Sequence, residues 1–246
     1  MNSDYPLISV IIPVWNGEQF LPEALGSIHA QEYPSLEIIV VDDGSTDNSA
    51  VIAQSDPTVN YYYQNNQGPG AAKNMGLKKA SGKFIAFLDS DDIWTRDTLR
   101  RHSSYLVNNP SVDIVQSQVQ EYCLNTYHQK FNPTTVPYFM FALMASSLYR
   151  KYVFDSVGFF DTTLSCSEDW DWTLRAYEMN IYKEKLNFPS LLYRKHDNNM
   201  TKFLTLSQLN LVKVYHGHLK RIRQQEHKME NLQIQKILDY FGHWPY

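Results

Sequence analysis

Acidic side chains gather at two places where a buried strand is expected to end. Asp42 and Asp43 follow the apolar run 36–41, and the sequence Asp-Ser-Asp-Asp at 89–92 follows the run 84–88. In an open α/β sheet, ligands bind beyond the carboxyl ends of the parallel strands. Carboxylates gathered there repel one another unless a cation or a hydrogen-bonding ligand joins them. Two such clusters at the ends of two strands of one sheet favour a ligand site over simple helix capping.

The spacing of Asp89 and Asp91 presents hard oxygen donors, which favour Mg²⁺ or Mn²⁺ over zinc. A Mg²⁺ ion held by one or two carboxylates completes its shell with water and with phosphate oxygens of a substrate. The pattern therefore indicates a metal–diphosphate ligand. The alternative for any single Asp is a helix cap, and Asp92 is placed to cap a helix from Trp94 onward.

The elements that must position these acids form an α/β pattern. Apolar runs predict strands at 7–14, 36–41, 59–63 and 84–88. Helices are expected after a cap at Asn16, after a cap at Ser45 or Thr46, and over 71–80. Strand–helix alternation at this spacing predicts right-handed βαβ units, and hence a mostly parallel central sheet flanked by helices.

The pattern loosens after about residue 110. Short strands, an aromatic-rich stretch at 127–141 and a helix at about 168–179 are expected there. Residues 205–240 contain no proline and one glycine, which predicts one or two helices. These shifts suggest two halves of one domain, about 1–110 and about 111–201, followed by a helical extension at 202–246.

Composition restricts the class of protein further. A chain of 246 residues builds a core without disulfides, and two cysteines suit a reducing compartment. The first residues lack the basic and apolar regions of a signal peptide, and no apolar run approaches the roughly 18 residues that span a bilayer. A cytoplasmic location is therefore expected. The net charge of −4 disfavours nucleic acid as a partner.

The charge is unevenly distributed. Residues 1–201 carry 15 Lys and Arg against 23 Asp and Glu, whereas residues 202–246 carry 7 against 3. Basic positions 213, 220, 221, 223 and 228 are interleaved with apolar ones. Three roles are open for this tail: packing on the body, self-association, or peripheral contact with the anionic cytoplasmic face of a membrane.

Other nucleotide-binding and hydrolytic classes lack their signatures. The chain has no Gly-x-x-x-x-Gly-Lys-[Ser/Thr] loop and no Gly-x-Ser-x-Gly elbow. Gly68-x-Gly70 lacks a third glycine at the dinucleotide spacing. His and Cys lack zinc spacing. A nucleotidyltransferase would need a basic glycine-rich loop after the first strand, where Trp15 and Asn16 stand instead.

Several segments resemble the family-two inverting glycosyltransferases. The resemblance is carried by ISVIIPVWN at 8–16, VVDDGSTD at 40–47, NQGPGAAKNMG at 66–76, FLDSDDIW at 87–94, VGFFD at 157–161, SEDWDW at 167–172 with Arg175, and the stretch 193–201. Together these segments cover about residues 7–201 in order. The resemblance implies a GT-A fold and transfer of a sugar from a nucleoside diphosphate sugar with inversion at the anomeric carbon.

The resemblance also implies roles for single residues. The donor-binding set is Pro13, Trp15, Asn16, Asp43, Lys73, Asp89, Ser90 and Asp91. Asp91 and Asp89, with His196 less directly, would hold Mn²⁺ or Mg²⁺. Asp169 would be the general base, with Glu168 and Trp170 on the acceptor side. Many members have Arg where Lys73 stands, and a Lys is a point charge where Arg offers a bidentate fork.

The processive polysaccharide synthases of this family add a Gln-x-x-Arg-Trp motif and membrane helices, and the chain has neither. We therefore expect addition of a single sugar in polysaccharide or glycoconjugate biosynthesis. The expected partners are a UDP-sugar or another nucleotide sugar, and a glycan or lipid-linked acceptor chosen by the stretch 118–147 and the tail. The alternative is a non-catalytic protein that binds a sugar nucleotide or glycan on the same fold.

Overall fold

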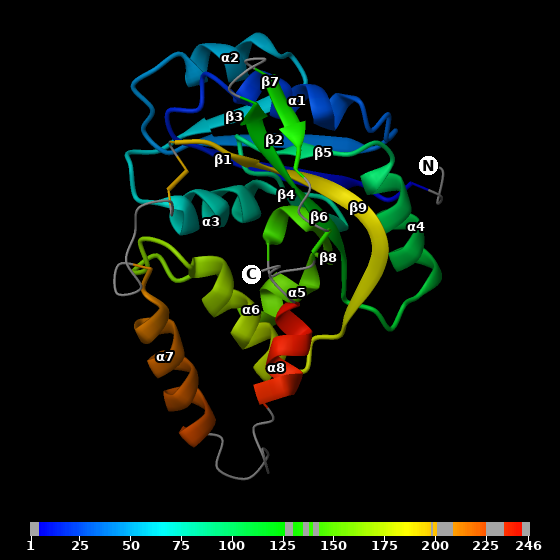
Figure 1. The fold of residues 1–246 in the computed structure, drawn as a ribbon, viewed down its shortest axis with the longest axis vertical. Coiled ribbons are helices and arrows are strands. Elements are labelled where there is room, and N and C mark those ends of the chain that lie inside the picture. The colour runs from blue at the N-terminus through cyan, green and yellow to red at the C-terminus, as the bar shows by residue number, and fades with distance from the viewer. Residues whose placement is uncertain are drawn as a thin grey trace.

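The computed structural model describes residues 5–125, 130–134, 138–139, 143–197, 199–200, 209–224 and 234–242 (Figure 1). The first part of this chain contains β1 (Ile8–Val14), α1 (Leu21–His29), β2 (Leu36–Asp42), α2 (Ser49–Ser55), β3 (Val59–Tyr63), α3 (Pro69–Lys79), β4 (Phe84–Phe87), β5 (Ile93–Trp94) and α4 (Thr98–Asn108). The second contains β6 (Ile114–Asn125), β7 (Lys130–Pro133), a 3₁₀ turn (Met144–Ser146), β8 (Ser147–Arg150), α5 (Tyr152–Val157), α6 (Glu168–Glu178), β9 (Lys183–Lys195), α7 (Leu211–Gln224) and α8 (Ile234–Phe241). Part of the predicted acceptor stretch and Lys228 lie outside the described residues.

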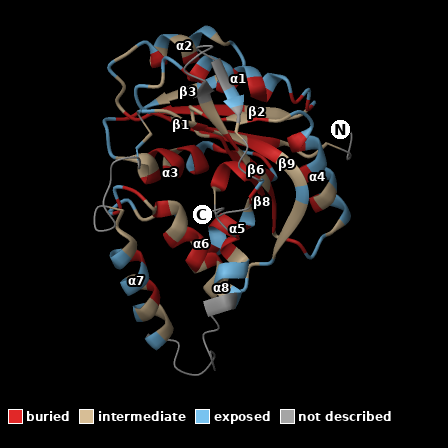
Figure 2. Cartoon of the chain, in the orientation of Figure 1, coloured by how far each residue is buried: buried red, intermediate tan, exposed pale blue. Residues whose placement is uncertain are grey.

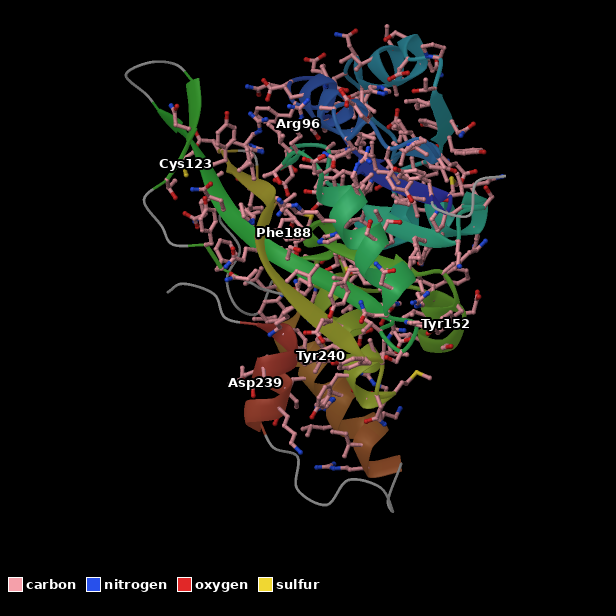
Figure 3. All side chains as sticks on the ribbon, turned by 90° about the vertical axis from the view of Figure 1, so that its right-hand side faces the viewer. Arg96, Cys123, Tyr152, Phe188, Asp239 and Tyr240 are labelled. Carbon is pink, nitrogen blue, oxygen red and sulfur yellow. The ribbon has the colours of Figure 1, made fainter. Side chains whose placement is uncertain are left out.

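Strand pairing confirms the α/β fold. The strands of the described chain form one sheet in the order β3-β2-β1-β4-β8-β6-β9-β5, with β7 beside β6. The pairs among β1 to β4 are parallel, as predicted. The second half is mixed, because β8 runs antiparallel to both β4 and β6, while β6 and β9 run parallel side by side (Figure 3). Parallel neighbours need a crossover connection, whereas antiparallel ones do not. Among the described residues between β6 and β8, β7 and the 3₁₀ turn stand where the first half of the chain has helices.

Alternating residues of β1 reach two separate cores, one on each face of the sheet. Ile8, Val10 and Ile12 pack with α1 and α4, whereas Ile11 packs with α3, α5 and α6. Figure 2 shows the strands buried between these helical layers. Burial on both faces explains why the first strands read as continuous apolar runs. The sheet therefore holds the ends of β1, β2 and β4 in fixed positions.

Close packing of α3 on the sheet yields a stability prediction at Gly76. A Cβ at this position would come 2.3 Å from Cγ2 of the buried Ile11. We expect Gly76→Ala to lower the free energy of unfolding by about 1–3 kcal/mol, because overpacking outweighs the gain in helix propensity. Gly26 in α1 is the matched control, since a Cβ there has no atom within 4 Å. Urea denaturation should show Gly26→Ala unchanged or stabilised by up to about 1 kcal/mol; equal losses in both variants would contradict the packing argument.

The basic tail packs on the body. Helices α7 and α8 extend below α6 in Figure 1 and share an apolar cluster with it. Lys213 donates to the carbonyl oxygen and the hydroxyl of Thr163, both at 2.9 Å, while Lys220 and Arg223 are exposed. Part of the basic face is therefore engaged by the body, and membrane contact and self-association remain predictions. No helix in the described ranges is long and apolar enough to cross a membrane.

Candidate functional site

The carboxyl ends of β1 and β2 lie side by side, and the loops that follow them are joined by hydrogen bonds. The Asn16 side-chain oxygen accepts from the backbone N–H of Thr46 at 2.8 Å, and the Asn16 N–H donates to Ser45 Oγ at 2.9 Å. The predicted caps at these three residues are therefore wrong: α1 begins at Leu21 and α2 at Ser49, and the polar side chains are used between the loops instead.

The remaining predicted residues of this edge lie on β1 and directly after it. Pro13 is partly buried and pairs in register with Val41 of β2. Trp15, one residue past the strand, leaves 60% of its surface exposed. A ring this exposed beside the ends of three parallel strands is free to cover a planar ligand.

Asp43 organises the glycine turn that starts α3. Its Oδ1 accepts from the side-chain amide of Gln64 at 2.7 Å and from the Gln67 N–H at 2.8 Å, and its Oδ2 accepts from the Gly68 N–H at 2.8 Å. Gly68 has φ +88°, which a side chain would disfavour. The buried carboxylate thus fixes the turn, and the expected contact of Asp43 with a nucleoside remains a prediction.

The acidic loop after β4 is held by Arg194 of β9. The Arg194 backbone N–H donates to Asp92 Oδ1 at 2.8 Å, and its Nε donates to the carbonyl of Asp91 at 2.7 Å. Burial, followed by the charges of Asp91 and Asp89, raises the pKa of Asp92 well above its ordinary value. Asp92 therefore binds β9 and does not cap a helix, since Trp94 belongs to β5.

The side chain of Asp91 lies among polar groups of the residues that follow β9. Its Oδ2 lies 3.0 Å from His196 Nε2 and 3.2 Å from Asn199 Nδ2. The structure thus brings together Asp91 and His196, which were predicted as neighbours. Ser90 beside them lies against Gly17, where a Cβ would come 3.1 Å from the Ser90 hydroxyl.

Arg194 and Asn199 were not predicted as site residues. In the sequence, both residues lie in the stretch 193–201, which resembles a segment of the family. That resemblance did not assign a role to either residue.

A buried ion pair joins α3 to the start of α6. Lys73 Nζ lies 2.7 Å from Glu168 Oε1, and both side chains are almost fully buried. Burial alone would lower the pKa of Lys73, but the charges of Glu168, Asp89 and Asp169 together raise it above its ordinary value. The structure therefore gathers one ammonium and three carboxylates from α3, the loop after β4, and α6.

Asp169 has an unusual environment within this group. Burial, and next the charge of Glu168, raises the pKa of Asp169 to about 7, against the opposing effect of Lys73. Burial and the charges of Asp91 and Glu168 likewise raise the pKa of Asp89, also against Lys73. A carboxylate with a pKa near neutrality suits proton transfer at physiological pH.

The two tryptophans beside Asp169 differ in their surroundings. Trp172 is buried, stacks on Phe154 with ring centroids 4.8 Å apart, and donates to the Gly158 carbonyl at 2.9 Å. Trp170 is partly buried and meets Phe241 of α8 edge-on at 5.9 Å. Trp172 is therefore a core residue, and the predicted place of Trp170 on the acceptor side remains a prediction.

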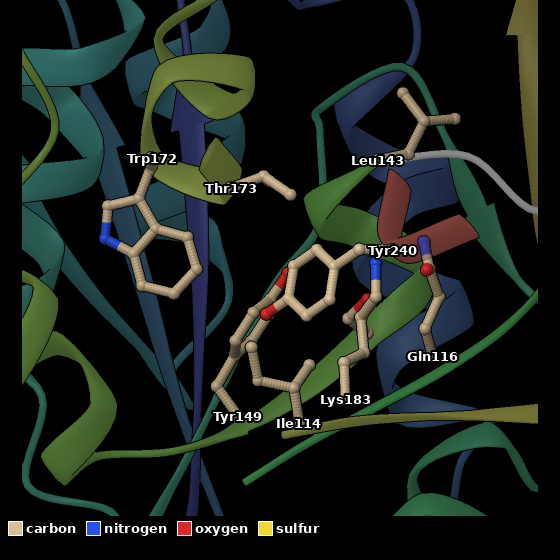
Figure 4. A pocket seen from close by; sticks show the side chains of 9 residues that line it. Ile114, Gln116, Leu143, Tyr149, Trp172, Thr173, Lys183 and Tyr240 are labelled. Carbon is tan, nitrogen blue, oxygen red and sulfur yellow. The ribbon is translucent and has the colours of Figure 1, made fainter. Parts of the chain in front are cut away.

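A small cavity lies behind α6, between that helix, the sheet and α8 (Figure 4). Gln116, Tyr149, Thr173 and Lys183 line it, and Tyr240 of α8 projects into it. Its free volume of about 10 Å³ is about what one water molecule needs, so it does not hold a sugar or a nucleotide. None of the predicted donor-binding residues lines this cavity, so it is distinct from the predicted donor site.

Comparisons with known proteins agree with this geometry. The model of the family described as glycosyl transferase family 2 matches residues 9–198. An uncharacterized glycosyltransferase of Rickettsia typhi is 30% identical over 244 residues, which cover 92% of this chain and 75% of that protein.

Solved structures share the fold. The crystal structure of Staphylococcus aureus TarS 1–349 in complex with UDP-GlcNAc has a TM-score of 0.75 at 24% identity, covering 96% of this chain and 71% of that one. A mannosyltransferase from Pyrobaculum calidifontis in complex with GDP-Man and Mn²⁺ has a TM-score of 0.61 at 19% identity, covering 96% and 68%. The GT-A fold is thereby confirmed, and the extent of the family match shows that this chain belongs to glycosyl transferase family 2 and is a glycosyltransferase.

Proposed function

We propose that the chain transfers one sugar from a nucleoside diphosphate sugar to an acceptor hydroxyl, with inversion and with Asp169 as the general base. The observation that carries this proposal is the position of Asp169. It lies in the first turn of α6, within the charged group of Lys73, Asp89 and Glu168, and its pKa is raised to about 7. Two structures with the same fold hold UDP-GlcNAc and GDP-Man, which supports a nucleotide sugar as the donor.

The reaction requires a single base on the acceptor side. Glu168 is engaged by Lys73, which leaves Asp169 as the carboxylate available to take a proton from the attacking hydroxyl. Proton removal in the transition state contributes typically 10²–10⁴-fold in rate, or about 3–5 kcal/mol. Attack from the side opposite the departing diphosphate inverts the anomeric carbon.

The residues around Asp91 fit a divalent cation. No three His, Cys, Asp or Glu side chains of the described chain converge as a complete metal site. Mg²⁺ and Mn²⁺ prefer oxygen ligands, and one or two carboxylates hold Mg²⁺ together with water and phosphate oxygens. Asp91 Oδ2 and His196 Nε2 would contribute at this position, with Asp89 beside them. When bound, the cation supplies Lewis-acid neutralisation of the charge on the departing diphosphate.

The donor and the cation are tested by calorimetry. We expect a UDP-sugar or GDP-sugar to bind more tightly with Mn²⁺ than without it, and Asp91→Ala to abolish that increase. Asp155→Ala is the control, because Asp155 is exposed on α5. Binding of no sugar nucleotide under any condition would refute the donor class, and a Mn²⁺ effect that persists in Asp91→Ala would refute the metal assignment.

A further inference from the structure

The two helices of the tail, α7 and α8, both pack against α6, the helix that carries Asp169. Helix α7 lies along one side of α6, and α8 lies against it as well, with Tyr240 over the cavity behind it (Figures 1 and 4). Val214 and Phe241 are buried in one cluster with Leu164 and Leu174 of the α6 region. The tail therefore buries apolar surface directly against the base-bearing helix.

Two side-chain hydrogen bonds join the tail to the residues just before α6. Ser167, immediately before Glu168, adopts φ +62° and donates its hydroxyl to the Leu209 carbonyl at 2.7 Å. Asn210, with φ +55°, donates its side-chain amide to Ser165 Oγ at 2.9 Å. These two bonds hold the turn before α7 against the residues that precede Asp169. We refer to the pair Ser167–Leu209 and Asn210–Ser165 as the latch.

The segment fixed by the latch also faces the donor side. A Cβ at Gly70, in the first turn of α3, would come 3.4 Å from Glu168 Cγ and 3.5 Å from the carbonyl oxygen of Asp161. The loop 161–167 thus lies between the glycine turn of α3 and the first turn of α7.

Toward the C-terminal end of α6, ion pairs join this helix to α7. Arg221 Nε lies 2.7 Å from Glu178 Oε2, and Arg221 Nη1 lies 3.2 Å from Asp171 Oδ1. His218, also buried, lies 2.5 Å from Glu178. These contacts join α7 to the later turns of α6, whereas the latch joins the turn before α7 to the residues that precede the first turn of α6.

We propose that the turn Leu209–Asn210 positions the proposed base: through Ser167 and Ser165 it fixes the first turn of α6 and thereby the carboxylate of Asp169. Ser167 and Asn210 are positioning residues that act through Asp169 and touch no reacting atom. This inference rests on the proposed function. A misplacement of about 1 Å at a reacting group costs on the order of 10²-fold in rate.

The test is the double variant Ser167→Gly/Asn210→Gly. Glycine adopts the positive φ at both positions and removes the side-chain hydrogen bonds, and the backbone freedom that it adds is matched by the control variant. We expect kcat to fall about 10- to 100-fold, with the dissociation constant of the nucleotide sugar, measured by calorimetry, unchanged within about twofold. Asn180→Gly is the matched control: Asn180 also has a positive φ, 56°, and is exposed just after the other end of α6. It should leave kcat unchanged.

The outcomes separate the two proposals. If Asp169→Asn abolishes turnover but the double variant retains its kcat, the positioning role is wrong and the base assignment stands. If Asp169→Asn retains turnover, the base assignment is wrong, and the positioning role that rests on it is wrong as well. If the double variant loses donor affinity and thermal stability in proportion to kcat, the latch is merely structural and the inference is overturned.

Discussion

Asp169→Asn is expected to lower kcat by about 10²–10⁴-fold while leaving the affinity for the donor unchanged. The amide cannot accept the proton of the attacking hydroxyl, so the contribution of general base catalysis is lost. The fold should tolerate the change, because Asn has nearly the same shape as Asp. In addition, the ion pair with Lys73 is formed by Glu168 and not by Asp169. Release of nucleoside diphosphate in the presence of acceptor measures kcat, and calorimetry measures donor binding.

The same residue predicts the pH dependence of the enzyme. Because the base must be deprotonated and its pKa is about 7, kcat/KM should rise with pH through about pH 7 and then level off. In Asp169→Asn this rise should disappear from the residual activity.

Asp155→Asn is the control for the base variant, since Asp155 is exposed on α5. A kcat for Asp169→Asn within about threefold of the parent would remove Asp169 from its role. Because that variant still turns over, the result would point to a different base and not to the non-catalytic binding protein that the sequence analysis kept as an alternative.

Much of this site was predictable because its residues follow local patterns. Continuous apolar runs marked β1, β2 and β4, and the parallel order of those strands places their ends at one edge. The acidic clusters at Asp42–Asp43 and Asp89–Asp92 therefore had to lie near one another. The pairing of strands after residue 110 was less accessible, because no strand–helix alternation constrains it.

Partners distant in the chain were not predictable. Lys73 and Glu168 are 95 residues apart, and Arg194 meets Asp92 across 102 residues. Each side chain has several chemically reasonable partners, and only the packing of α3, α6 and β9 selects among them. The predicted helix cap at Asn16 is wrong for a related reason. Its short polar side chain suits a cap, but in the structure it accepts a hydrogen bond from Thr46 of the neighbouring loop. Long-range burial, rather than residue type, determined these outcomes.

Among the substitutions considered, replacement of Lys73 is expected to lower the free energy of unfolding the most. Lys73→Met leaves Glu168, Asp89 and Asp169 as neighbouring carboxylates without their common cation. Breaking a buried pair in this way costs about 3–5 kcal/mol in the free energy of unfolding. Glu168→Met should cost less, because the two other carboxylates still compensate Lys73. The double variant should cost less than the sum of the single variants, since no charge of the pair is then left alone.

The loss in Lys73→Met should depend on pH in a defined direction. Lys73 opposes the raised pKa values of Asp89 and Asp169, so its removal raises both values further above those of the unfolded chain. The folded variant then binds more protons than the unfolded one, and its stability relative to the parent rises as the pH falls from 8 to 5. Lys78→Met, on the exposed face of α3, is the matched control and should change stability by less than about 1 kcal/mol. Urea denaturation at both pH values decides the matter: an additive double variant, or a loss that is constant with pH, would show that Lys73 does not neutralise the carboxylates around it.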